Sequence, residues 1–221
     1  VESGRPSTLC TAAMLSRGDV RDRLIGAESI AELPEGGRVG TSSPRRAAQL
    51  LRLRPDLTIV PIRGNLDTRL AKVAAGEVDA TLLAAAGLDR LGRHAVGKPI
   101  PVDVLLPAPG QAAIGIECRA NDNEAHAQLA RVDDHLTAMA VRAERAFARS
   151  LGGSCHSPVG ALAEIRAGKV RLRAELLSED GRDHVADEAM FAVGDDAAAE
   201  ELARAMLDRA PPSIRALFTA A

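Results

Sequence analysis

Apolar residues in the first half of the chain fall into short runs, and a segment with helical periodicity follows each run. The predicted order is a strand at 38–43, a helix at 44–54, a strand at 57–64, a helix at 65–76 and a strand at 78–84 that continues into a helix. Ser43 and Asn65 are suitable N-cap residues, and Pro44 suits the first position of a helix. Strands and helices that alternate at this spacing predict βαβ units on a parallel sheet.

The second half of the chain has a different pattern. Residues 97–111 contain four prolines, which predicts an extended linker or hinge. One more apolar strand is predicted at 112–119. A long amphipathic helix is predicted at 133–153, and alternating residues at 158–193 predict a three-stranded antiparallel meander. A last helix is expected at 195–210. The fold class is therefore α/β, with a parallel-sheet part followed by a small α+β domain that has an antiparallel sheet.

Composition narrows the class of partner. The chain has 221 residues with a net charge of −2, and its aromatic residues are three Phe with no Tyr or Trp. Recognition of nucleic acid by base stacking needs aromatic side chains, and no apolar run approaches the roughly 20 residues of a membrane span. We therefore expect neither nucleic acid nor a membrane as partner.

Three cysteines, Cys10, Cys118 and Cys155, lie far apart and form no C-x-x-C pair. This sparse and odd number favours a reducing, cytoplasmic location over a disulfide framework or a structural zinc site, so no metal site is expected. Cys118 lies in the predicted strand 112–119 and is expected in the core. No histidine stands in a metal-binding spacing; the five are His94, His126, His135, His156 and His184.

Two segments, GTSSPRR (40–46) and RGNLDTRL (63–70), place arginines where a strand is expected to end and a helix to begin. A helix N-terminus attracts anions, and arginine binds carboxylate or phosphate through paired N–H groups. If the two strands are neighbours, both junctions face one crevice at the carboxyl edge of the sheet. The predicted ligand carries several carboxylates or phosphates, and the alternative is a solvated helix start with surface arginines. The candidate side chains are Thr41, Ser42, Ser43, Arg45, Arg46, Arg63 and Arg69.

Cys155 lies in a turn of small residues, LGGSCHSPVG, at 151–160. The local sequence leaves open whether its thiol packs in the core, binds a metal, forms a disulfide, acts as a nucleophile or carries an attached group. Among the acidic residues, Asp67 is expected close to two arginines of its own segment. Glu117 and Glu144 are as easily structural as catalytic, and no carboxylate stands out as a proton donor.

Five motifs occur in a fixed order along the chain. They are VGTSSPRRAAQL, RGNLDTRL, LLAAAGLDRLG, LPAPGQAAIGIECR and ERAFARSLGGSCHSPVGALA. Together the motifs resemble those of the hydroxymethylbilane synthase (porphobilinogen deaminase) family, from about residue 11 to the C-terminal end. The resemblance implies two domains built like periplasmic binding proteins, with the active site between them, and a small third α+β domain. On this basis residues 1–14 and 109–131 belong to domain 1, 15–108 to domain 2 and 132–221 to domain 3.

The resemblance also implies a transferase reaction of porphyrin and haem biosynthesis. Four porphobilinogen units are condensed head to tail into hydroxymethylbilane, with loss of one ammonia per unit, by an enzyme expected to be a monomer. The growing chain is primed by a dipyrromethane cofactor, which a thioether joins to the loop cysteine that Cys155 matches. The residues that match the positions binding cofactor and substrate carboxylates are Thr41, Ser42, Ser43, Arg45, Arg46, Arg63, Gly64, Arg69 and Arg90.

Two motifs of the family, R-x-S-x-L-A and the K-D-x-P that carries its catalytic carboxylate, do not occur in this sequence. We therefore expect an N-terminally truncated form in which no catalytic residue is identified. By itself this form is expected to bind the cofactor weakly or not at all. The alternatives are a non-enzymatic module that binds carboxylates and a truncated product without function.

Overall fold

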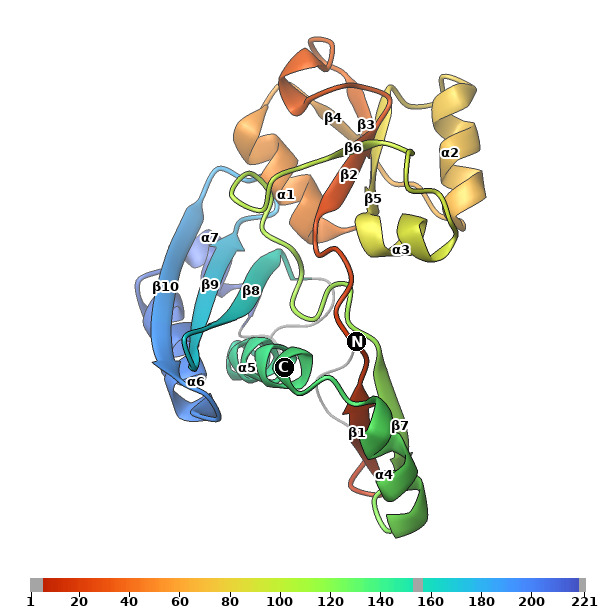
Figure 1. Ribbon diagram of the computed structural model, residues 1–221. Coiled ribbons are helices and arrows are strands. Elements are labelled where there is room, and N and C mark those ends of the chain that lie inside the picture. Colours follow the sequence, from red (N-terminus) through yellow and green to blue (C-terminus); the bar gives the residue numbers. More distant parts are fainter. Residues whose placement is uncertain (1–5, 153–156, 219–221) are drawn as a thin grey trace.

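The computed structural model describes residues 6–152 and 157–218, and their strands form three separate sheets (Figure 1). One sheet has five strands and contains the parallel part, one has three antiparallel strands, and one is a two-stranded ribbon. The predicted class, α/β with a separate antiparallel sheet, is confirmed. Within the described residues no helix has the length and apolar character needed to cross a bilayer.

The five-stranded sheet carries the predicted strand and helix alternation. Its order is β4 (Thr58–Val60), β3 (Arg38–Gly40), β5 (Ala80–Ala84), β2 (Asp22–Ile25) and β6 (Lys98–Pro99). Strand β3 is parallel to β4 and β5, whereas β2 is antiparallel to β5 and β6. The strands β2 and β6 were not predicted, because four and two residues are too short to show a period of two.

Three helices follow the parallel strands: α1 (Pro44–Leu53), α2 (Leu66–Ala74) and α3 (Ala85–Arg90). The predicted caps are confirmed, since the side chains of Ser43 and Asn65 accept hydrogen bonds from the backbone N–H groups of Arg46 and Thr68. Between the helices and the sheet lies a core of fully buried aliphatic side chains, which includes Leu24, Val39, Leu50, Leu82 and Leu105. A short 3-10 helix at Ile30–Glu32 lies between β2 and β3.

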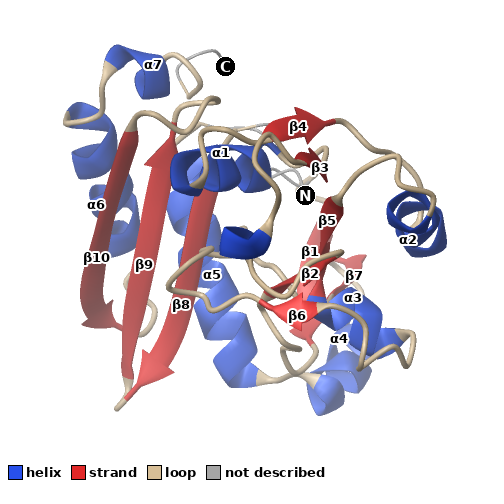
Figure 2. Ribbon diagram, turned by 90° about the horizontal axis from the view of Figure 1, so that it is seen from above, coloured by secondary structure: helices blue, strands red, loops and turns tan. Residues whose placement is uncertain are grey.

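The three-stranded sheet is the predicted meander, in the order β10 (His184–Ala192), β9 (Lys169–Leu177) and β8 (Val159–Arg166). Helices α5 (His135–Ser150) and α6 (Asp196–Asp208) cover one face of the sheet, and α1 lies on the other (Figure 2). Phe147, Leu172 and Met206 are buried between the sheet and its helices. The short helix α7 (Pro212–Arg215) adds the buried Ile214.

The ribbon joins β1 (Leu9–Met14) to β7 (Gly115–Arg119) in antiparallel pairing and lies apart from both larger sheets (Figure 1). Helix α4 (Asn123–Leu129) packs beside it, and a 3-10 turn at Ala130–Val132 leads on toward α5. The expectation that Cys118 lies in the core is wrong. Cys118 is half-buried, because two strands and one short helix cannot enclose a side chain as a full sheet does.

A buried ion pair fastens the segments that meet between the sheets. The Glu144 carboxylate in α5 is fully buried and receives two bonds from the Arg17 guanidinium, at 2.7 and 3.0 Å. It also accepts hydrogen bonds from the backbone N–H groups of Gly110, at 2.6 Å, and Ala163, at 2.8 Å. Burial raises the pKa of the Glu144 carboxyl, and the bonds from Arg17 and the two amides oppose that rise. Four segments distant in sequence therefore converge on one carboxylate.

Candidate functional site

The two strand-to-helix junctions lie side by side at one edge of the five-stranded sheet. Strands β3 and β4 are parallel neighbours, with Arg38 opposite Thr58 and Gly40 opposite Val60. Beyond the strands, the Thr41 N–H donates to the Val60 carbonyl at 3.0 Å, and the Ser42 hydroxyl donates to the Ile62 carbonyl at 2.7 Å. The expectation that the junctions share the carboxyl edge is confirmed, because it required only that the strands be neighbours.

The three hydroxyl side chains of the first junction shape its backbone. Besides the bond from Ser42, the Ser43 N–H donates to the Thr41 hydroxyl oxygen at 3.2 Å. The Ser43 side chain in turn caps α1 by accepting the Arg46 N–H. Thr41 is buried, and Ser42 is exposed. These bonds hold the chain in the turn that starts α1 and so fix the N-terminal end of that helix.

Arg45 and Arg46 both bind the carboxylate of Asp22 from β2. Arg45 reaches one oxygen at 2.9 Å and Arg46 reaches the other at 2.7 Å. Arg45 is buried and also donates to Gln49 and to the Leu106 carbonyl, whereas Arg46 also donates to the Leu82 carbonyl. The two arginines thus lie against protein groups beneath the junction, and the buried Nε atom of each has no hydrogen-bond partner among the described residues.

Asp22 balances this pair of positive charges. Burial alone would raise its pKa, but the attraction of Arg45 and Arg46 and their hydrogen bonds outweigh burial and hold the pKa of Asp22 below its ordinary value. The fully buried guanidinium of Arg45 has a lowered pKa, first because of its own burial. Asp22 is therefore an ionised carboxylate at neutral pH, and it keeps both arginines in a fixed position.

The second junction holds cations that are more accessible. Arg63 is exposed, and no described residue forms a hydrogen bond or ion pair with its side chain. Arg69 donates from Nε to the Gly64 carbonyl at 3.0 Å, which leaves its other N–H groups free of described partners. Gly64 has a φ of +114°, and a Cβ there would lie 2.7 Å from Thr68, so this turn requires glycine.

Arg90 and Asp67 complete the set of predicted residues. Arg90, at the end of α3, is exposed and donates to the Ala112 carbonyl at 3.0 Å. Asp67 is expected close to two arginines of its own segment, but its ion pair is with Arg93, at 2.5 Å. The helical turn directs Asp67 toward the loop after α3, which sequence proximity could not reveal.

Cys155, the predicted attachment residue, and its neighbour His156 lie outside the described residues. Helix α5 ends at Ser150, before these residues, and strand β8 begins at Val159, after them.

A second arginine-rich hollow, which the sequence patterns did not single out, lies between β1 and α5. Arg142, Arg145 and Arg149 line it together with Thr11 and Asp133. Arg142 is bound by Asp196 at 2.7 Å. The spacing of three and four residues between the arginines places them on one side of α5 and was the available signal. Such a hollow suits a carboxylate-bearing ligand.

Comparison with known proteins identifies matches over almost the whole chain. Residues 1–127 match the family model described as porphobilinogen deaminase, dipyrromethane cofactor binding domain, and residues 138–208 match porphobilinogen deaminase, C-terminal domain. The porphobilinogen deaminase of Sphingopyxis alaskensis is 56% identical over 99% of this chain, which spans 70% of that relative. The porphobilinogen deaminase of Roseiflexus sp. is 50% identical over 80% of this chain, and the aligned part spans 59% of that relative. The porphobilinogen deaminase of Geobacillus kaustophilus is 46% identical over 92% of this chain, and the aligned part spans 70% of that relative.

Proposed function

Because the chain belongs to the porphobilinogen deaminase family, we propose that it binds a dipyrromethane primer through its arginine-lined sheet edge and links that primer to Cys155. The primer supplies the pyrrole end on which porphobilinogen units are condensed into hydroxymethylbilane. The observation that carries this proposal is the pair of parallel strand-to-helix junctions, which places Arg63 and Arg69 beside the N-terminal ends of α1 and α2.

The charges at this edge fit a polycarboxylate. Porphobilinogen bears an acetate and a propionate, so a chain of such units presents a row of carboxylates. Arg63, Arg69 and Arg90 have guanidinium groups that can donate hydrogen bonds directly to carboxylates. Charge-assisted bonds of this kind are among the stronger hydrogen bonds in proteins.

The remaining predicted residues have a positioning role in this proposal. Thr41, Ser42 and Ser43 fix the start of α1, and Arg45 is held beneath it by Asp22. Asp67 is paired with Arg93 and Glu144 with Arg17, so neither is assigned a proton-transfer role. The proposal therefore gives these residues binding and anchoring functions and names no general acid among them.

The proposal also includes a cytoplasmic monomer that acts on a small molecule without nucleic acid or membrane. The sparse set of cysteines supports the cytoplasmic location, and the net charge of −2 and the near absence of aromatic side chains argue against nucleic acid as a partner.

Intact-protein mass spectrometry tests the attachment. After incubation with porphobilinogen, a minor fraction of the chain is expected to gain the mass of two linked pyrrole units, and Cys155→Ser is expected to gain none. Cys10→Ser is the matched control, and we expect it to load like the unchanged chain, because Cys10 lies on the ribbon, away from the arginine-lined edge of the five-stranded sheet. An adduct that persists in Cys155→Ser would place the link on another residue. Loading far below one adduct per chain would agree with the expected weak binding, and complete loading would contradict it.

Replacing Arg63 by alanine tests the arginine-lined sheet edge. Loss of one charge-assisted contact of about 1.5 kcal/mol is expected to weaken the binding of porphobilinogen about tenfold, measured by isothermal titration calorimetry. Arg166→Ala is the control, because Arg166 lies at the end of β8 and pairs only with Glu164 among the described residues. Equal affinities of the two variants would contradict the proposed role of Arg63.

A further inference from the structure

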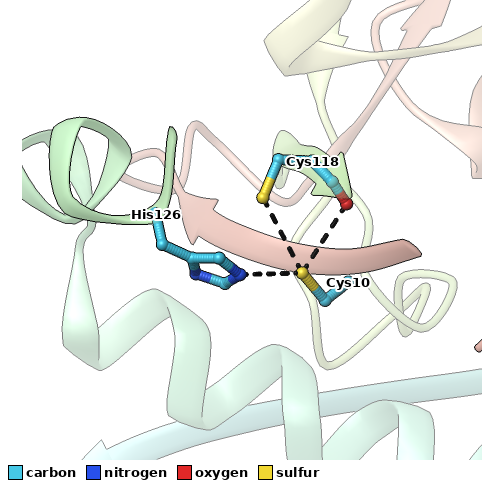
Figure 3. Close-up of side chains that lie close together, drawn as sticks. All are labelled: Cys10, Cys118 and His126. Carbon is cyan, nitrogen blue, oxygen red and sulfur yellow. Dashed lines mark hydrogen bonds between the residues drawn. The ribbon is translucent and has the colours of Figure 1, made fainter. Parts of the chain in front are cut away.

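Two cysteines and one histidine that are distant in sequence come together at the end of the ribbon (Figure 3). The Sγ atoms of Cys10 and Cys118 lie 3.8 Å apart, and Cys10 Sγ lies 3.0 Å from Nε2 of His126. All three potential ligand atoms lie within 4.8 Å of one another, and all three residues are half-buried. Packing of Cys118 in an apolar core would not explain why a second thiol and an imidazole nitrogen lie so close to its side chain.

The backbone fixes each member of this cluster. Cys10 in β1 and Cys118 in β7 are directly opposite in the antiparallel register, so their side chains leave the ribbon on the same face. Asp122 caps α4 by accepting the Ala125 N–H, and the His126 N–H donates to the Asp122 carbonyl. Only three residues separate β7 from α4, and the first turn of α4 therefore brings Nε2 of His126 to the thiol of Cys10 (Figure 3).

We propose that Cys10, Cys118 and His126 bind one thiophilic metal ion of the Zn²⁺ class, with a water molecule in the fourth position. Thiolate and imidazole are the ligands that zinc prefers, and three protein ligands with one open position make a common zinc coordination. In a tetrahedral site with Zn–S bonds of about 2.3 Å, two sulfur ligands are about 3.8 Å apart. The observed separation of the two sulfurs equals that edge.

The third ligand needs a small movement. With Zn–N and Zn–S bonds of about 2.0 and 2.3 Å, a nitrogen and a sulfur ligand are about 3.5 Å apart, so His126 must move outward by roughly half an ångström from Cys10. Because α4 is short and its histidine is half-buried, a side-chain rotation can supply this movement. Partial exposure of the cluster also gives an ion and its water ligand access from solvent.

The charges and protons balance in the proposed site. Two thiols lose their protons to solvent, and the two resulting thiolates neutralise the dication while neutral His126 donates its Nε2 lone pair. No oxidant is required. A disulfide is the competing fate of the two thiols, but it would bring the sulfurs to about 2.05 Å and leave His126 without a role.

The metal would join β1, β7 and α4, which lie together at the end of the molecule opposite the five-stranded sheet (Figure 1). A two-stranded ribbon has little stability of its own, and a cross-link of three segments compensates for the missing core. The inferred site is therefore a clamp on the ribbon that keeps one ligand position open to solvent, and it is separate from the arginine-lined sheet edge. It does not depend on the proposed cofactor chemistry.

The test uses the full chain with Cys155→Ser, in which Cys10 and Cys118 are the only thiols. We expect it to bind one Zn²⁺ per chain, measured by elemental analysis after gel filtration. Titration with Co²⁺ is expected to give the near-ultraviolet thiolate-to-metal band and the intense visible bands of a tetrahedral site. The bound metal is expected to raise the thermal unfolding temperature.

Variants separate this site from adventitious binding. Cys118→Ser is expected to lose the thiolate-to-metal band of a two-sulfur site, and His126→Gln, which keeps both thiols, is expected to bind Zn²⁺ at least about tenfold more weakly. His94→Gln is the matched control, because His94 is exposed and bonds Asp89 instead of a thiol. Stoichiometry near zero, affinity that is unchanged in His126→Gln, or quantitative formation of a Cys10–Cys118 disulfide in the presence of Zn²⁺ would overturn the proposal.

Discussion

Replacing Glu144 by alanine is expected to lower the free energy of unfolding by about 3–5 kcal/mol, because the change leaves a charged Arg17 without its partner in a buried place. Arg17 is 12% exposed and Glu144 is fully buried, so solvent cannot replace the lost carboxylate. The backbone N–H groups of Gly110 and Ala163 lose their acceptor in the same step. Each of these groups then has an unmet hydrogen bond in the interior.

Urea denaturation followed by circular dichroism measures this change. Glu164→Ala is the matched control, because the Glu164 carboxylate is 34% exposed, its nearer partner Arg166 is 58% exposed, and Arg173 lies farther away, at 3.8 Å. Exposed pairs of this kind contribute about 1 kcal/mol or less. If the Glu144→Ala and Glu164→Ala midpoints are equal, the buried pair does not fasten the segments as described.

Replacing Asp22 by alanine is expected to be about as severe, with a loss of roughly 3 kcal/mol or more. Asp22 neutralises two arginines, and its removal leaves Arg45 and Arg46 close together beneath the first junction without a counter-charge. Asp103→Ala, which removes an exposed partner of Arg173, is the control and is expected to cost less than about 1 kcal/mol. A small effect at Asp22 would show that the arginines find other acceptors.

The same carboxylate gives a pH dependence with a definite sign. The pKa of Asp22 in the folded chain lies below its ordinary value of 3.8, so the stabilisation it contributes is present above that value and is lost as the pH falls through the lower folded pKa. The difference in urea midpoint between the unchanged chain and Asp22→Asn is therefore expected to be largest at neutral pH and to shrink below about pH 4. A difference that grows on acidification would contradict the ion pair.

Most of the fold was predictable from short-range pattern. The helices α1, α2, α5 and α6 and the strands of the meander have enough residues to show their periods, and caps such as Ser43 and Asn65 mark where helices begin. The strands β1, β2 and β6 were missed. The strands β2 and β6 have four residues or fewer, and β1 can be recognised as a strand only from its pairing with β7, which is distant in sequence.

The candidate site was predictable to the level of residue types. Alternating strands and helices imply a common carboxyl edge, so the arginines of the two junctions could be brought together on sequence grounds alone. The partner of each arginine could not be predicted. Asp22, which holds Arg45 and Arg46, comes from β2, and Asp67 turns away to Arg93.

The sequence by itself determined the class of fold, the helix starts, the shared sheet edge and the family, because each depends on near neighbours in the chain or on an ordered set of motifs. Only the tertiary structure decided which distant charges and thiols meet. Cys10 and Cys118 are 108 residues apart, and Arg17 and Glu144 are 127 apart. Contacts at such separation follow from how sheets and helices pack, and no local pattern encodes them.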